Sequence, residues 1–150
     1  MSFDLDAIKT DPKKAIEGVE LPYRAGSKLI IAKHNNKDAQ NYRMVEMIKH
    51  GELLTKVHEG EATDEETAQA DQLAIDIETW VLAYHILKGW SGIKRGGKAL
   101  KYTPELGFDL LSDPHNSDFR EDVIRMSQNN ANFRPEEKAK AQVKKAAASS

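Results

Sequence analysis

The 150-residue sequence contains no cysteine, no long apolar run and no excess of charge of one sign. Without thiols the chain forms neither disulfides nor thiolate zinc sites, and it has no cysteine nucleophile. No apolar run approaches the ~20 residues that a membrane helix requires. The 22 basic and 24 acidic residues nearly cancel, which argues against binding a polyanion with the whole surface.

Catalytic motifs are also missing. The sequence has no HExxH helix, no Walker loop, no dinucleotide fingerprint and no Gly-x-Ser-x-Gly elbow. His115, Asp118 and Asp122 share one helical face and form the best metal candidate, but acids at a helix start are explained more simply by the helix dipole. We therefore expect a binding protein without cofactor or metal, and not an enzyme.

The length and the ends of the chain predict one domain with two appendages. The acidic N-terminus lacks the apolar core of a secretory signal, which indicates a soluble cytoplasmic protein. We divide the chain into an N-terminal arm (1–17), a helical domain that opens with a hairpin (18–134) and a flexible polar tail (135–150). The tail has Val143 as its one large apolar residue, too little to offset the entropy cost of ordering it.

Periodicity predicts a β-hairpin followed by helices. Val19, Leu21 and Tyr23 alternate with polar residues or proline, and a turn separates them from a second strand at residues 28–33. A helix begins at Asp38 and carries an apolar face. Its predicted members are Tyr42, Val45 and Ile48.

The most strongly marked helix begins at the capping box Thr63–Glu66 and continues to Leu87. Two shorter helices follow Thr103-Pro104 and Ser117. The expected fold is thus mainly α: a single domain of about four helices with a small N-terminal β-hairpin and a flexible C-terminal tail.

Aromatic residues near the end of the long helix are the candidate partner-binding residues. Such residues are more often core, but this stripe is wide for so small a chain, and an uncovered remainder typically marks a partner surface. The candidates are Trp80, Tyr84, Trp90 and Tyr102.

The loop 88–101 carries the alternative function. It contains five basic residues and no acid, with the aromatic residues Trp90 and Tyr102 near its two ends, a composition that suits nucleic acid. Acidic stretches on both sides weaken this field. The five residues are Lys88, Lys94, Arg95, Lys98 and Lys101.

The order of the segments between residues 80 and 134 resembles the tail assembly chaperones of long-tailed bacteriophages. The resemblance rests on Gly89-Trp90-Ser91-Gly92-Ile93, on Tyr102-Thr103-Pro104-Glu105 and on the helices that follow. The basic turn Lys94–Lys98 departs from the acidic turn that this family tends to carry.

The resemblance implies a non-catalytic role in virion morphogenesis in the host cytoplasm. Such a chaperone binds the tape measure protein, keeps it soluble and helps to recruit tail tube subunits, and self-association is a further expectation. The competing hypothesis is a small nucleic-acid-binding regulator that uses the basic loop 88–101, and we expect no membrane partner.

Overall fold

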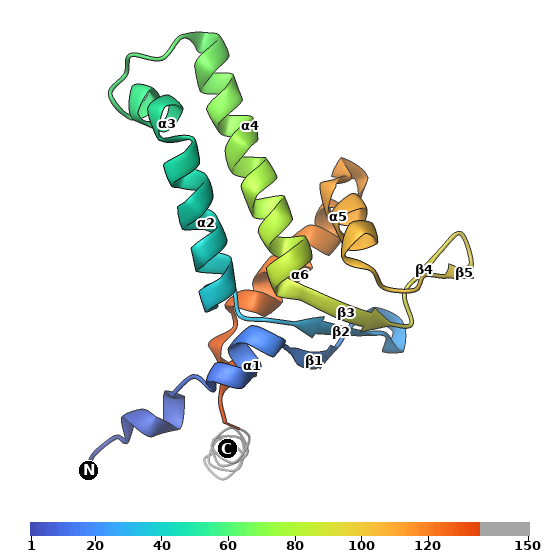
Figure 1. Cartoon of the computed structure of the whole chain (residues 1–150). Helices are drawn as coiled ribbons and strands as arrows, with labels where there is room; N and C mark the ends of the chain where they lie inside the picture. Colours follow the sequence, from blue (N-terminus) through green and yellow to red (C-terminus); the bar gives the residue numbers. More distant parts are fainter. Residues whose placement is uncertain (136–150) are drawn as a thin grey trace.

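The computed structural model describes residues 1–135, so that all of the expected tail beyond Pro135 lies outside the described residues. As the sequence predicts, the fold is mainly helical with a small antiparallel sheet near the N-terminus. Two parts stand out in Figure 1: a compact base around the sheet, and a pair of helical segments that projects from it.

The expected hairpin is confirmed and gains a third strand. Strand β1 (Val19–Pro22) pairs with β2 (Lys28–Ile31), and β2 pairs with β3 (Leu87–Ser91), all antiparallel, in the order β1-β2-β3. Pro22 therefore lies on an edge strand, where its missing N–H is tolerated. Strand β3 departs from the sequence prediction, because the apolar stripe of the long helix includes Leu87 and so predicts a helix through that residue.

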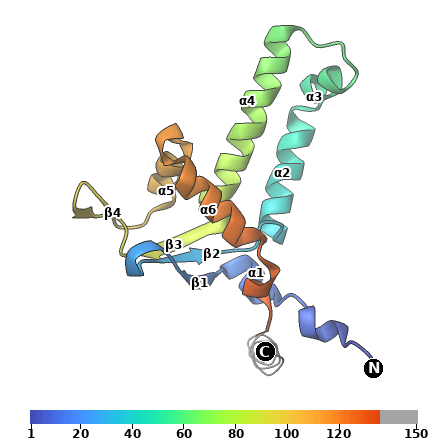
Figure 2. The same ribbon diagram turned by 180° about the vertical axis from the view of Figure 1, so that it is seen from behind.

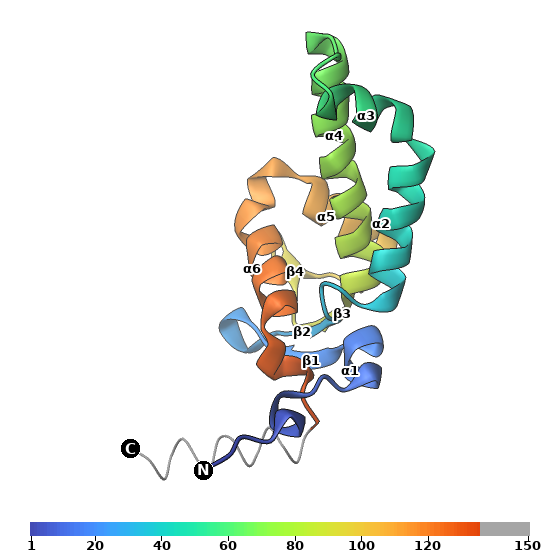
Figure 3. The ribbon, with the colours of Figure 1, turned by 90° about the vertical axis from the view of Figure 1, so that its left-hand side faces the viewer.

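Three helices form the part that projects, which we call the helical projection (residues 37–81). Helix α2 (Lys37–Lys49) rises from the base, α3 (Gly51–His58) bends over at the tip, and α4 (Asp64–Val81) returns (Figures 1 and 3). The capping box predicted at Thr63 and Glu66 is present in both directions. Because the return helix is long, the tip of the projection stands well clear of the sheet.

The core lies around the connection between α4 and the sheet. A π-helical turn, Leu82–Ile86, connects α4 directly to β3, and its apolar side chains are buried with those of β2. This junction packs against the C-terminal helices. The fully buried members of the core include Leu29, Ile31, Val81, Ile86, Leu87, Leu111, Val123 and Phe133.

The remaining helices cover the other side of α4. Helix α5 (Pro104–Ser112) and helix α6 (Ser117–Gln128) begin close to the predicted positions and lie on the side of α4 opposite to α2 (Figure 2). The short strands β4 (Lys94–Arg95) and β5 (Lys98–Ala99) form a small hairpin that extends from the base.

The segment expected to be an N-terminal arm is only partly arm-like. Residues Leu5–Ile8 form a single exposed 3-10 turn that points away from the base (Figure 1). Helix α1 (Pro12–Glu17) instead docks on the body, because Ala15 is buried and its carbonyl accepts a hydrogen bond from the Lys33 N–H at 2.9 Å.

A buried carboxylate joins the hairpin to α6. Asp122 accepts hydrogen bonds from the Tyr23 hydroxyl at 2.6 Å, from Arg24 Nε at 3.1 Å and from Arg125 Nη2 at 2.8 Å. The Tyr23 hydrogen bond is the largest cause that lowers the pKa of Asp122 below its usual value, and the two arginines add to it. The charged form is therefore the one that stabilises the fold.

This network predicts a loss of stability in acid. Because the pKa of Asp122 is lower in the folded than in the unfolded state, its contribution is present above about pH 4 and is lost as the pH falls through the folded pKa. We expect Asp122→Asn to lower the free energy of unfolding at pH 7 by about 1–3 kcal/mol. The melting temperature of this variant should also fall less steeply than that of the wild type as the pH is lowered below about 4.

The matched control is Glu121→Gln, an exposed acid one residue earlier on the same helix. It should leave both the melting temperature at pH 7 and its pH dependence nearly unchanged. Equal acid sensitivity in the wild type and in Asp122→Asn would show that another carboxylate governs unfolding.

Candidate docking surface

A single buried side chain fixes the base of the helical projection. The Asn36 amide donates to the carbonyls of Lys33 at 2.8 Å and His85 at 2.9 Å. Its side-chain oxygen accepts from the Ala39 N–H at 3.0 Å and so caps α2. The start of α2 is thereby tied to the turn that follows α4.

Two ion pairs hold α2 and α3 against α4 further up. Arg43 Nε and Nη2 donate to the two carboxylate oxygens of Glu78 at 2.7 and 3.1 Å, and Arg43 Nη1 donates to the His34 carbonyl at 2.8 Å. Near the tip, Lys56 Nζ lies 3.0 Å from Glu66. The bidentate pair fixes the spacing of the helices more firmly than a single contact would.

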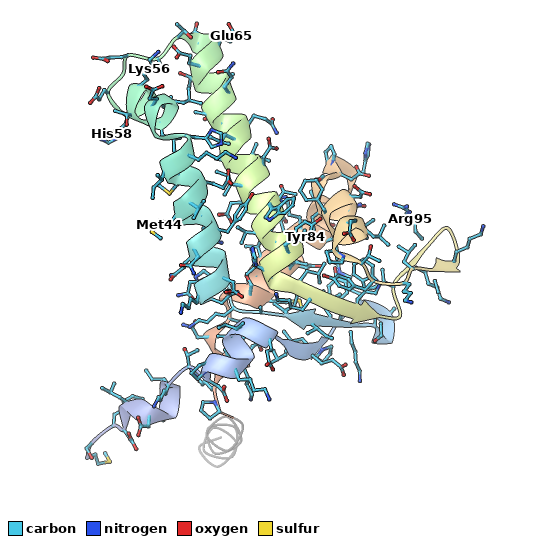
Figure 4. All side chains as sticks on the ribbon, viewed as in Figure 1. Met44, Lys56, His58, Glu65, Tyr84 and Arg95 are labelled. Atoms are coloured by element: carbon cyan, nitrogen blue, oxygen red, sulfur yellow. The ribbon has the colours of Figure 1, made fainter. Side chains whose placement is uncertain are left out.

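Four large apolar side chains on α2 face solvent. Met44, Val45, Met47 and Ile48 are 55%, 57%, 58% and 74% exposed. Figure 4 shows Met44 pointing away from α4. Isolated exposed apolar residues are ordinary, but four of them within two turns of one helix form a patch of the kind that marks a binding surface.

This patch continues into a cleft between the helices. The cleft has a volume of about 260 Å³ and is lined mainly by apolar side chains. Met47 and Arg43 line both the cleft and the shallow depression beside Met44 and Ile48, so the two are continuous. We call the whole surface the apolar groove. Its cleft is lined by Arg43, Met47, Leu54, Leu73, Ala74, Ile77 and Glu78.

The sequence did not reveal this groove. The sequence predicts one apolar face with Tyr42, Val45 and Ile48 as members, but of these three only Tyr42 packs against α4, where its ring centroid lies 5.9 Å from that of Trp80. The sequence does contain a signal for the groove. Met44 and Met47 widen the apolar face of α2 until it is broader than one neighbouring helix can bury.

The four aromatic candidates lie in two separate places. Trp80 stacks on Tyr84, with ring centroids 4.0 Å apart and planes at 19°, and it remains 37% exposed. Phe108 meets the edge of this pair at 6.1 Å. Trp80 near the end of α4 and Tyr84 in the π-helical turn after it therefore form an aromatic stack, bounded by Tyr42 on α2 and Phe108 on α5.

Trp90 and Tyr102 form the second pair, below the basic loop. Their rings meet edge to face at 4.9 Å, Trp90 Nε1 donates to the Leu100 carbonyl at 2.8 Å, and the Tyr102 hydroxyl donates to the Leu87 carbonyl at 2.7 Å. Burial raises the pKa of Tyr102 to about 12. The polar atoms of this pair are thus used within the chain, where they fasten the loop to β3.

The basic residues do not gather into one cluster. Lys94, Arg95 and Lys98 are exposed on the β4–β5 hairpin, where Figure 4 labels Arg95. Lys94 and Arg95 also line a depression between the hairpin and the C-terminal helices. Lys88 lies at the other end of the loop, with its Nζ 3.3 Å from the Tyr84 carbonyl. The loop therefore presents four exposed cations, the fourth being Lys101, which is a small electrostatic footprint.

The sequence-based metal candidates are not brought together. The Asp122 carboxylate is already occupied by Tyr23 and two arginines, while His115 Nδ1 lies 3.2 Å from Asp113. Across residues 1–135 no group of three or more histidine, aspartate or glutamate side chains is placed to hold a metal ion.

No helix among the described residues is both long and apolar enough to cross a bilayer. The part of the chain that the structure describes is thus a small helical protein whose most distinctive surface is an apolar groove.

The family of the chain follows from comparison with known sequences. The model of the YdaY prophage protein family matches residues 22–145, most of the chain, and the protein belongs to this family. The family agrees with the phage origin that the resemblance implied. Neither the curated proteins nor the solved structures contain a match.

The two aromatic pairs should respond differently to loss of a hydroxyl. Tyr102→Phe leaves the buried Leu87 carbonyl without its donor and should lower the free energy of unfolding by about 1–2 kcal/mol. Tyr84→Phe is the matched control, because the Tyr84 hydroxyl forms no hydrogen bond within residues 1–135, and it should cost no more than about 0.5 kcal/mol. Equal losses in urea denaturation would show that the Tyr102 hydrogen bond does not fasten the loop.

Proposed function

We propose that the protein is a non-catalytic phage tail assembly chaperone whose apolar groove binds helical segments of the tape measure protein. In this role it acts in the host cytoplasm, keeps its client soluble and helps to recruit tail tube subunits. The observation that carries the proposal is the patch of four exposed apolar side chains on α2, continuous with the cleft against α4. The prophage family supports the phage setting.

The groove has the chemistry of a surface that accepts an amphipathic helix. Such a helix presents apolar side chains at intervals of three or four residues, and these would enter the cleft between α2 and α4. Burying a large apolar side chain completely contributes about 1.5–3 kcal/mol, so covering side chains that are already half-buried contributes roughly 1 kcal/mol each. Several such contacts are enough to hold a client helix in the groove and still allow it to dissociate.

Low selectivity also fits a chaperone for a long client. The two charged residues that line the cleft, Arg43 and Glu78, are bonded to each other, which leaves few polar groups to demand a particular sequence. Met44 and Met47 have flexible, polarisable side chains that adapt to different neighbours. A groove of this kind can take successive helical segments of one long protein.

In this proposal the aromatic residues predicted from the sequence are not the main binding surface but support it. Trp80 is exposed enough to add a partner contact beside α2, and Tyr84 supports it by stacking. Trp90 and Tyr102 contribute by holding the basic loop in place. The four exposed cations of that loop favour, as the second candidate, weak binding of nucleic acid.

Co-expression with the cognate tape measure protein tests the proposal. The wild type should raise the soluble fraction of the tape measure protein and co-purify with it. Met47→Asp places a charge where the two parts of the groove join and should reduce recovery of the complex at least fivefold. The matched control, Ile75→Asp, removes a side chain that is 54% exposed on α4 but does not line the groove, and it should leave recovery unchanged.

Two results would contradict the proposal. One is a tape measure protein that stays equally insoluble with and without this chain. The other is sub-micromolar, sequence-dependent nucleic-acid binding near 150 mM salt that is lost when Lys94, Arg95 and Lys98 are changed to alanine. The second result would establish the regulator in place of the chaperone.

A further inference from the structure

We infer that a second copy of this chain pairs with the outward face of α2 in an antiparallel, two-fold arrangement. The proposal does not depend on the tape measure protein, because it concerns how the isolated protein covers its own exposed helix.

The face in question is defined by the contacts of α2 with the rest of the chain. Ala39 is buried, Tyr42 packs on Trp80, and Arg43 bonds to Glu78, so these residues mark the side of α2 that turns inward. Met44 and Ile48 are one turn apart on the opposite side. A second α2 laid along this line would cover Met44 and Ile48, two of the four exposed apolar side chains of the helix.

Charges on one flank of this face select the direction of pairing. Asp38 and Lys49 are both exposed, and neither forms an ion pair within residues 1–135. They are separated by eleven residues, close to three helical turns, so they lie on the same flank, near opposite ends of the helix.

An antiparallel two-fold axis sets like flanks of two helices beside each other and reverses their direction. Asp38 of one copy then lies across from Lys49 of the second copy, and symmetry repeats the pair at the other end. A parallel pair would set this flank against the opposite one and would align the two helix dipoles unfavourably. Asp38 and Lys49 are therefore complementary to their symmetry mates in the antiparallel arrangement and not in the parallel one.

The size of the face indicates a weak pair. A 13-residue helix is about 20 Å long, and one such contact buries less than the roughly 1,600 Å² of a standard stable interface. Exposed ion pairs add little affinity, although they fix orientation. We expect association in the range of tens to hundreds of micromolar, which a better-fitting partner can displace.

Charge reversal in sedimentation equilibrium tests the arrangement. The apparent molecular mass of the wild type should rise from 16.8 kDa toward twice that value as its concentration increases. Asp38→Lys and Lys49→Asp should each weaken self-association at least fivefold, because each sets like charges across the two-fold axis. An equimolar mixture of the two variants should associate at least as well as the wild type, since every cross-copy pair then joins opposite charges.

A cross-linking measurement covers the event that a charge reversal disturbs folding. The chain has no cysteine, so a single introduced thiol reports on one position. Met44→Cys lies near the middle of α2, close to the two-fold axis, and should form an intermolecular disulfide at least tenfold faster than Ile75→Cys at equal concentration. The two positions are matched, because the native side chains are 55% and 54% exposed.

The proposal is overturned if the mixed charge variants associate no better than each variant alone, or if both cysteine variants cross-link at the same slow rate. A complex with the tape measure protein in the absence of any self-association would likewise overturn it, while leaving the chaperone proposal intact.

Discussion

The helical projection depends on the way one buried amide satisfies three backbone groups at its base. Asn36 caps α2 and at the same time donates to the carbonyls of Lys33 and His85. These three groups belong to the end of the hairpin, the start of α2 and the turn after α4. Because an unsatisfied polar group at this depth costs about 1–3 kcal/mol, the arrangement of the two helices and the sheet that satisfies all three groups is favoured.

With its base fixed, the projection has little core of its own. Val81 and the turn after it are buried, whereas Ile77 and Leu73, one and two turns higher on α4, line an open cleft. The Arg43–Glu78 pair keeps α2 and α4 at a spacing that the intervening side chains do not fill completely. The apolar groove is thus a consequence of the helix spacing that Asn36 and the Arg43–Glu78 pair set.

Local signals in the sequence were sufficient for most elements. The capping box at Thr63 and the proline start at Pro104 predicted helix starts, since each acts within one turn. Strand β3 was missed because the apolar run around Leu87 fits a helix as well as a strand, and its pairing with β2 is set by distant residues. The groove was missed for the same reason: which side of α2 meets α4 is decided by Asn36 and Arg43, not by periodicity.

Hydrogen exchange on the complex with a soluble tape measure fragment tests most directly whether the groove is the docking surface. Binding should slow exchange in residues 40–58 and 70–78, on the two sides of the cleft, and leave the loop 88–101 unchanged. Protection confined to the loop 88–101, or complex formation with no protection on α2 or α4, would contradict the account.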